Sequence, residues 1–376
     1  MVGGNSCSTH TNYLRKRLTD IESLPDEVLF DVFVRLQAQD IYDSARLVCS
    51  KWYHMIHTHT FIYTHLQHST YGLLFQYMLG KMRHSCFVAL GESGRVEIST
   101  NRYNKLKCPI LTSCNGLVLG SQEGTNKNLY VSNPVTRQIF TLPPIVGYTS
   151  VYEIFAIAYA AASMEYKAVV LFFPNRGKKR MCCILAIGVD NSWRTIGQES
   201  VSLAATQMFV SAPLITEGFV HFYHTTSNEV LTLNVETEII TETSGPAPEG
   251  NQRNTYLSTG RYLSLLRPCG KFCWEVWEMK PKIDYGWRKV WDISLEAYKL
   301  STFNRLGYNE YDEFLFPVGW LKYLEMLVFR PSYTIGSRIF VYNLLTYKIV
   351  TIVLPSGDCD YNHVVHKDSL VSLRGC

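Results

Sequence analysis

Between residues 24 and 56 the hydrophobic positions recur with the period of a helix. The apolar face of a first helix would contain Leu29, Val32, Phe33 and Leu36. Pro25 suits the first turn, because its missing N–H needs no partner there, and Asp26 and Glu27 suit the positive end of the helix dipole. Ser23 is the expected N-cap.

Two further helical segments follow the first. Ile41, Ala45, Leu47 and Val48 indicate the second segment, and Val48, Trp52, Met55 and Ile56 indicate the third. Three helices in about 40 residues are too small to bury all their apolar faces alone. We therefore expect this module to pack on a partner or on a neighbouring domain.

From Cys86 onward the pattern changes to short runs of Val, Ile, Leu, Phe and Tyr, separated by Gly, Asn, Pro and Ser, which predicts strands and turns. A unit of about three strands recurs five times, over residues 114–144, 166–196, 218–240, 262–291 and 325–350. Four-stranded blades stacked around an axis bury their faces and protect their edges, so the repeat predicts an all-β propeller.

Two local signals support the repeat. Asn-x-x-Thr recurs at Asn133, Asn234 and Asn343, where Asn tolerates left-handed geometry and can hydrogen-bond its own turn. Trp-Arg pairs begin 193–195 and 287–289 and mark the same strand in two copies.

The ends of the β region are expected to form one more blade. Residues 87–90 and 95–98 predict a hairpin, and Ser369–Leu373 predicts a single strand that pairs with it and closes the ring. The prediction is six blades, with seven as the alternative; a β-sandwich or open β array is the other arrangement. Residues 67–85 are interpreted as a helical joint ending near Gly80, and residues 1–20 as a mobile tail.

Composition narrows the class of protein. The chain has 376 residues and a net charge of +4, from 36 basic and 32 acidic side chains, which is too balanced for a dedicated nucleic-acid binder. A hydrophobic content of 47% allows a large core. The first 20 residues lack the apolar region of a secretory signal, and the apolar runs are too short to cross a membrane. We expect a soluble protein of the nucleus and/or cytoplasm whose eleven cysteines are reduced thiols.

The helical module resembles an F-box. The resemblance is carried by Leu24-Pro25-x-Glu27, Val28-Leu29, Arg35-Leu36, Asp40-Ile41, Arg46, Val48-Cys49, Lys51-Trp52, Phe61 and His65-Leu66. Gln37 departs from it, since many members have Pro after the Arg-Leu pair. The family implies docking on a Skp-type adaptor, and through it on cullin and RING proteins. The implied contacts are Leu24, Pro25, Val28, Leu29, Val32, Leu36, Ile41, Leu47, Val48, Cys49 and Trp52. The alternative is a helical cap that packs only on its own chain.

The β region resembles the F-box-associated, kelch-like domain of plant F-box proteins. The matching segments are 113–117, 133–137 with 142–144, 166–167, 192–194 and 368–373. The predicted chain is thus an all-α F-box at 21–66, a joint at 67–85 and an all-β propeller at 86–376. The resemblance implies that the propeller recognises a protein substrate, whose identity and binding residues the sequence leaves open.

The sequence contains no phosphate-binding loop, no GxSxG and no HExxH motif. Cys269 and Cys273 are one residue too far apart for a zinc knuckle, and Cys182 and Cys183 would point to opposite faces of a strand. The His pairs 221/224 and 363/366 are also expected to face opposite ways. The basic run 176–180 fits a solvated hairpin loop, a nuclear signal or a basic rim for an acidic target.

These observations predict a non-catalytic, cofactor-free substrate-recognition subunit of an SCF-type (Skp–cullin–F-box) E3 ubiquitin ligase. Such a subunit contributes positioning, because it raises the effective concentration of a target lysine. Membranes and direct nucleic-acid contacts are not expected. Two alternatives stay open. One is a non-degradative scaffold, such as a transcriptional co-regulator. The other is a propeller enzyme or lectin, which would need convergent carboxylates or a metal in the central channel.

Overall fold

The computed structural model describes residues 24–91, 93–100, 103, 106, 108–122, 128–145, 153–172, 181–196, 212–223, 228–248, 253–280, 286–296, 315–331, 338–355 and 361–373. The predicted tail at 1–20, the Ser23 cap and the basic run at 176–180 lie outside these residues. The chain divides into two compact units, Met1–Ser69 and Thr70–Cys376, which are described separately.

The first unit is helical. It contains α2 (Asp26–Val34), α3 (Ala38–Asp43), the 3-10 turn η1 (Ala45–Leu47), α4 (Ser50–Ile56) and α5 (His59–His68). The helix α2 has Asp26 and Glu27 in its first turn, as predicted. Pro25 is its N-cap residue and not, as expected, a residue of the first turn, because its ψ of 148° is extended. The helix α5 follows the three predicted segments as an additional helix. Its N-cap is Thr58, whose Oγ1 accepts a hydrogen bond of 3.2 Å from the Phe61 amide.

Aromatic side chains join the helices of this unit. The rings of Phe33 and Trp52 meet edge to face with centroids 4.6 Å apart, which packs α2 on α4. The rings of Phe30 and Phe61 meet in the same way at 5.3 Å and pack α2 on α5. These contacts give the short helices a small shared core.

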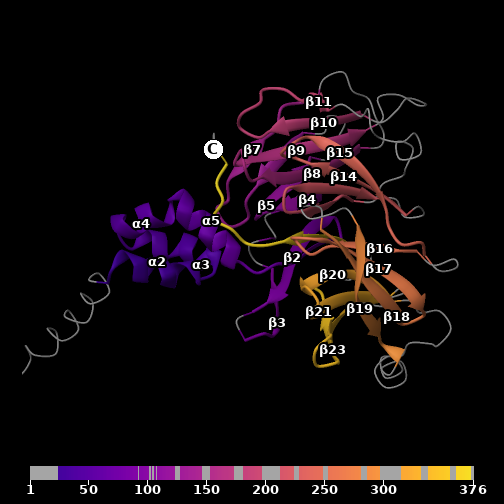
Figure 1. The fold of residues 1–376 in the computed structure, drawn as a ribbon. Helices are drawn as coiled ribbons and strands as arrows, with labels where there is room; N and C mark the ends of the chain where they lie inside the picture. The colour runs from indigo at the N-terminus through magenta and orange to yellow at the C-terminus, as the bar shows by residue number, and fades with distance from the viewer. Residues whose placement is uncertain are drawn as a thin grey trace, which may run out of the picture. The chain divides into compact units, whose positions relative to one another are not determined.

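The second unit consists of six four-stranded antiparallel sheets (Figure 1). The closing blade contains β24 (Tyr361–His366), β1 (Gly72–Leu79), β2 (Met82–Leu90) and β3 (Val96–Ser99). Blade 1 contains β4 (Ile110–Cys114), β5 (Leu117–Ser121), β6 (Leu129–Ser132) and β7 (Ile139–Thr141). Blade 2 contains β8 (Glu153–Ala160), β9 (Glu165–Phe172), β10 (Met181–Ala186) and β11 (Arg194–Ile196).

The remaining blades follow the same order. Blade 3 contains β12 (Leu214–Thr216), β13 (Phe219–Tyr223), β14 (Glu229–Asn234) and β15 (Ile239–Ser244). Blade 4 contains β16 (Thr255–Ser258), β17 (Leu263–Gly270), β18 (Cys273–Met279) and β19 (Trp287–Ser294). Blade 5 contains β20 (Leu315–Lys322), β21 (Met326–Pro331), β22 (Arg338–Asn343) and β23 (Lys348–Val353).

The six sheets form the predicted six-bladed propeller. The strands at one edge of each sheet contact one another in the series β24, β4, β8, β12, β16 and β20, so these inner strands line the axis. Apolar clusters fill the spaces between blades 2 and 3, between blades 4 and 5, and between blade 5 and the closing blade. The five sequence repeats correspond to the second, third and fourth strands of blades 1 to 5.

The ring closes through a different strand from the predicted one. The predicted hairpin exists as β2 and β3, but the last strand of the closing blade is β24, which pairs with β1 from Gly72↔His366 to Tyr77↔Tyr361. Ser369–Leu373 lies outside the strands, so its predicted strand is wrong. Its alternating pattern arises because Leu370, Val371 and Leu373 are buried without joining a ladder.

The predicted helical joint at 67–85 is also wrong beyond α5. Leu79 pairs with Met82, so Gly80 and Lys81 form a two-residue hairpin loop between β1 and β2. Gly80 has φ +62°, the left-handed geometry that such a loop requires. A short apolar run ending in Gly fits a capped helix and a buried strand equally well, and only the pairing partners separate the two.

The Asn-x-x-Thr segments form one kind of turn in three blades. The side-chain Oδ1 of Asn133 accepts from the Val135 amide at 2.9 Å, Asn234 accepts from Glu236 at 2.9 Å, and Asn343 accepts from Leu345 at 2.9 Å. The predicted hydrogen bond is therefore confirmed. The left-handed residue is not Asn, however, but the one four positions later: Arg137, Glu238 and Tyr347.

Candidate functional site

The helix α2 has two apolar stripes, one buried against other helices and one exposed to solvent. Leu29 and Phe33 lie on its buried side. Leu24, Val28, Val32 and Leu36 recur at every fourth position along and beside the helix, and all four are exposed. Residues four apart lie on one face of a helix, so these side chains form a continuous exposed stripe.

The turn η1 adds two further exposed apolar side chains. Leu47 is 65% exposed and Val48 is 58% exposed. A small helical unit gains nothing by solvating so much aliphatic surface, and clustered exposure of this kind marks an interaction site. We call the exposed members of the predicted contact set the docking surface. They are Leu24, Pro25, Val28, Val32, Leu36, Leu47 and Val48.

Four other predicted contacts are placed differently. Leu29 is 2% exposed and Ile41 is 0% exposed, so neither can contact a partner, and their assignment as contacts is corrected to core residues. Cys49 and Trp52 are half-buried, and Trp52 packs on Phe33. Helical periodicity assigned core and surface residues to one contact set, because both sides of α2 are apolar.

Polar contacts fix the helices that carry the docking surface. Lys51 Nζ on α4 lies 2.5 Å from Asp26 Oδ1 at the start of α2. The buried His65 on α5 places its Nε2 2.9 Å from the Leu36 carbonyl oxygen, at the end of the exposed stripe. Both ends of α2 are thereby tied to other helices, which presents the stripe on a pre-ordered element.

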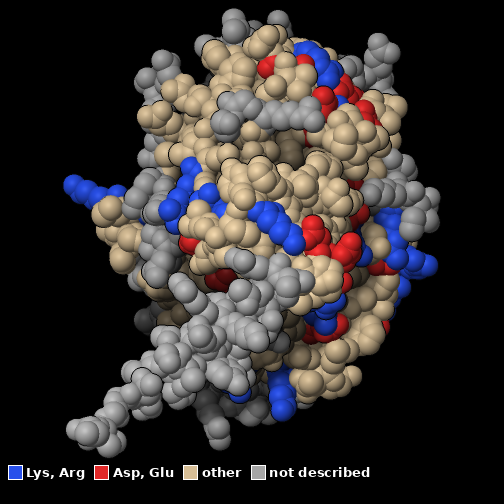
Figure 2. Space-filling model, turned by 90° about the vertical axis from the view of Figure 1, so that its left-hand side faces the viewer, with Lys and Arg blue, Asp and Glu red and all other residues tan. Residues whose placement is uncertain are grey.

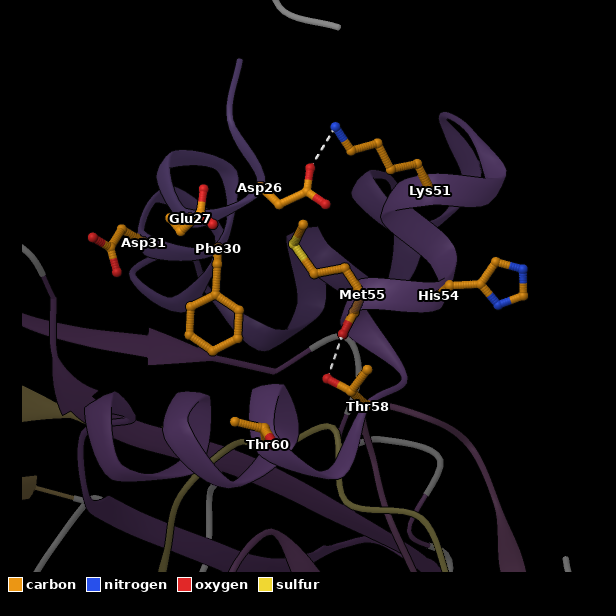
Figure 3. A pocket seen from close by; sticks show the side chains of 9 residues that line it. All are labelled: Asp26, Glu27, Phe30, Asp31, Lys51, His54, Met55, Thr58 and Thr60. Carbon is orange, nitrogen blue, oxygen red and sulfur yellow. Dashed lines mark hydrogen bonds and ion pairs between the residues drawn. The ribbon is translucent and has the colours of Figure 1, made fainter. Parts of the chain in front are cut away.

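An open groove of about 810 Å³ lies between α2, α4 and the start of α5. Figure 3 shows Phe30 and Met55 directed into it and His54 directed away. Its rim carries the carboxylates of Asp26, Glu27 and Asp31, and Lys51 bridges to one of them. The helical unit therefore has an acidic groove in addition to its apolar docking surface.

Sequence reasoning missed two exposed aromatic residues of the helical unit. Tyr53 on α4 is exposed and stacks on His57 with centroids 4.0 Å apart. Tyr63 on α5 is also exposed. The signal that could have found Tyr53 is its position next to Trp52, since adjacent helical residues point in different directions and only one of the two can enter the core.

Histidines on the propeller strands contact other side chains of the propeller. His221 is buried and hydrogen-bonded to Thr216 and Thr232, and burial lowers its pKa to about 3. The ring of His366 meets Phe87 whereas that of His363 lies beside Phe75, as expected for opposite faces of a strand. Within the described ranges, no three His, Cys, Asp or Glu side chains converge as metal ligands.

One buried cation was not anticipated from the sequence. Lys367 follows β24, is almost fully buried, and holds Nζ 4.6 Å from the centre of the Tyr71 ring. Burial lowers the pKa of its ammonium to about 8. The surface carries charges of both signs. Figure 2 shows basic and acidic side chains interspersed among large areas of other residues on the face displayed.

Comparison with known sequences connects the two units. The family described as "F-box associated beta propeller domain" matches residues 40–257, from α3 of the helical unit to β16 of blade 4. This is more than half of the chain. The chain belongs to this family. It is a plant-type F-box protein in which a helical F-box unit precedes a six-bladed F-box associated propeller.

Individual relatives agree with the family. F-box protein At3g07870 of Arabidopsis thaliana is 24% identical over 360 residues, covering 81% of each chain. F-box protein At5g49610 of the same plant is 22% identical over 293 residues, covering 73% of this chain and 80% of the relative. Among solved structures, the nidogen/laminin complex has a similar chain, with 9% identity, a TM-score of 0.43 and coverage of 79% of this chain and 98% of that one. In the described part of this F-box protein, no helix is long and apolar enough to span a membrane.

Proposed function

We propose that this F-box protein is the substrate-recognition subunit of an SCF-type E3 ubiquitin ligase, acting in the nucleus and/or cytoplasm. The helical unit docks a Skp-type adaptor, and through it cullin and RING proteins. The propeller binds the protein to be ubiquitinated. The observation that carries the proposal is the docking surface, whose stripe on α2 continues the Leu24-Pro25 pair of the F-box pattern.

The energetics favour a partner on this surface. Burying an exposed aliphatic side chain contributes roughly 1.5 kcal/mol or more, and Val28, Val32 and Leu47 are each substantially exposed. The contacts of Leu36 and Asp26 tie the backbone of α2 to neighbouring helices, so little backbone conformational entropy is lost there on association. The surface therefore has the properties of a pre-formed, apolar protein interface.

The subunit would contribute no covalent chemistry. Its part in ubiquitin transfer is to hold the target beside the ligase machinery, where proximity replaces a bimolecular encounter. Burial raises the pKa of the Cys114 thiol to about 12 and that of Cys86 to about 12, which suppresses their thiolates at neutral pH. Both thiols suit packing rather than thioester formation.

The proposal is tested by co-expression of the full chain with a Skp-type adaptor, a cullin and a RING protein. Wild-type protein is expected to co-purify with all three, and Leu47→Asp/Val48→Asp to lose them, because two carboxylates would have to be buried in an apolar interface. Folding of the variant is checked by circular dichroism. Co-purification of the folded variant at the wild-type level would refute the assignment. A stable complex whose bound targets ignore proteasome inhibition would favour a scaffold.

A further inference from the structure

The outer strands of the six blades are protected to different degrees against pairing with another chain. An exposed edge strand is normally kept short, charged or bulged. The strands β7 and β11 have three residues, and β3 has four. The strand β15 contains Glu242. The strand β19 contains charged residues, and its register with β18 shifts between Val276 and Trp277.

The strand β23 is less protected among the residues described, because its single charged residue, Lys348, stands at its first position. It has six residues, and its register with β22 runs unbroken from Asn343↔Lys348 to Arg338↔Val353. Its five residues after Lys348 are all β-branched: Ile349, Val350, Thr351, Ile352 and Val353. β-Branched residues favour the extended conformation, and β23 is the outermost strand of blade 5 (Figure 1).

Both faces of β23 pack on apolar clusters, and among the described strands β23 pairs with β22 alone. Ile349 packs against the cluster shared with blade 4, and Ile352 packs against the cluster shared with the closing blade. Val350 is 51% exposed and Val353 is 64% exposed. In an antiparallel ladder each residue directs its N–H and C=O to one side, and successive residues alternate. Every second residue of β23 therefore directs both backbone groups away from β22.

The charged residues of β22, β23 and the turn between them are all basic. From Arg338 to Val353 the sequence contains no Asp or Glu. Lys348 is exposed at one end of β23, and Arg338 stands opposite Val353 at the other end. Glu325 approaches the β22–β23 turn through its backbone, but its carboxylate lies 2.6 Å from Lys322 Nζ. A ligand strand with acidic residues at its ends would complement this edge.

We propose that the outer edge of β23 binds an extended segment of the target protein, which adds to blade 5 as a fifth strand. Backbone hydrogen bonds would supply affinity. Specificity would come from β-branched or aromatic residues at alternate positions and from acidic residues that meet Lys348 and Arg338. The inference rests on the proposed function, in that it names the class of segment through which the propeller holds its target.

The length of the strand favours a peptide over a second copy of this chain. A stable interface between two folded proteins buries about 1,200 Å² or more, and one six-residue ladder falls well below that. An extended peptide needs no such area, because it can make ladder hydrogen bonds and alternate side-chain contacts along its whole length.

The test uses a library of random twelve-residue peptides displayed on phage and panned against the full-length protein. The expected result is enrichment of peptides with alternating β-branched or aromatic residues flanked by Asp or Glu. Affinities of the enriched peptides are then measured for Val350→Pro and Thr351→Pro. Because successive amides alternate in direction, one proline removes a bond to β22 and lowers the melting temperature, whereas the other removes only an outward donor.

The outward proline is expected to weaken peptide binding about tenfold while the melting temperature stays near the wild-type value. A second variant, Val350→Asp/Val353→Asp, replaces exposed side chains and is expected to weaken binding at least as much. The matched control is Ile239→Asp, which alters an exposed residue of the outer strand β15 and should bind like wild type.

Three results would overturn the inference. They are enrichment without the acidic, alternating pattern, enriched peptides that bind both β23 variants as tightly as wild type, and a concentration-dependent dimer that these variants abolish. The dimer would assign the edge to a second copy of the chain. Adaptor binding, measured on the same preparations, separates the two proposals: its retention without peptide binding refutes only the role of β23, and its absence refutes the proposed function.

Discussion

The side-chain amide of Asn133, in the first blade, donates a hydrogen bond of 2.8 Å to the carbonyl oxygen of Val371, near the end of the chain. The same amide donates to the Ser369 carbonyl oxygen at 3.0 Å. Asn133 is buried and also closes its own turn, so one side chain joins blade 1 to the segment that follows β24.

This arrangement predicts that Asn133→Ala is far more costly than the same change in a sister turn. Asn133→Ala leaves two buried carbonyl oxygens without their donor and should lower the free energy of unfolding by about 3 kcal/mol. Asn343→Ala removes only the turn hydrogen bonds on an exposed surface and should cost about 1 kcal/mol. Urea unfolding of the two variants measures both values. Equal losses would show that the contact with the C-terminal segment adds nothing.

Ring closure predicts a strong effect of deleting residues 361–376. The deletion removes β24, so the inner edge of β1 loses its ladder, and the six-bladed ring opens. The truncated protein should unfold over a broad temperature range and form soluble aggregates, as measured by calorimetry and size-exclusion chromatography. Deletion of residues 374–376 alone serves as the control. Cooperative unfolding of the longer deletion at the wild-type temperature would contradict this account of closure.

A partly buried ion pair joins blades 2 and 3. The nearly buried Lys167 places Nζ 2.9 Å from both the Val235 carbonyl oxygen and Glu238 Oε1. The Arg194 guanidinium, which hydrogen-bonds the Glu238 carboxylate, is the main cause that holds the pKa of Glu238 at about 2. Glu238→Gln would leave the Lys167 ammonium without its counter-charge and should cost about 3 kcal/mol.

The matched variant is Arg194→Gln, which removes a more exposed partner of the same carboxylate and should cost under about 1 kcal/mol. Both losses are measured by chemical unfolding at pH 7. If Arg194→Gln proved the more harmful, the surface pair rather than the buried lysine would dominate this junction.

Buried histidines predict that the propeller loses stability below about pH 6.5. Burial lowers the pKa of His221 from 6.5 to about 3, so the unfolded chain binds a proton there that the folded protein does not. Stability from this residue is present above pH 6.5 and is lost as the pH falls toward 3. His363, with a pKa of about 4, acts in the same direction.

His221→Gln should therefore flatten the dependence of unfolding free energy on pH between about 4 and 6 by about 1.4 kcal/mol per pH unit. The exposed His54 provides the control, since His54→Gln should leave the slope unchanged. The slopes come from urea titrations at several pH values. An unchanged slope in His221→Gln would mean that the imidazole is protonated in the folded state.

Much of the fold could be predicted because each blade repeats local chemistry. The Asn turns at 133, 234 and 343 and the Trp-Arg strands fixed the second to fourth strands of five blades. The closing pair of β1 and β24 could not be predicted in the same way. Its two strands are separated in sequence by nearly all the other strands of the propeller. An apolar run ending at Gly80 does not indicate which strand it pairs with.

The docking surface was predicted as a set of residues but not as a surface. Helical spacing identified Leu29 and Val32 alike as apolar, although one is buried and the other is exposed. The distinction depends on where Phe61 and Trp52 pack, which is a tertiary property. That β23 is an outer strand could not be predicted from the sequence for the same reason, since an outer strand differs from an inner strand only in what lies beside it.

The central claim, that the exposed stripe of α2 docks a Skp-type adaptor, is tested most directly by isothermal titration of the full-length protein with that adaptor. Val28→Asp/Val32→Asp changes two exposed side chains and should weaken binding by about 100-fold or more. Tyr63→Asp, at an exposed site on α5, should bind within about twofold of wild type. Wild-type affinity in the folded double variant, or no binding by the wild-type protein, would contradict the account.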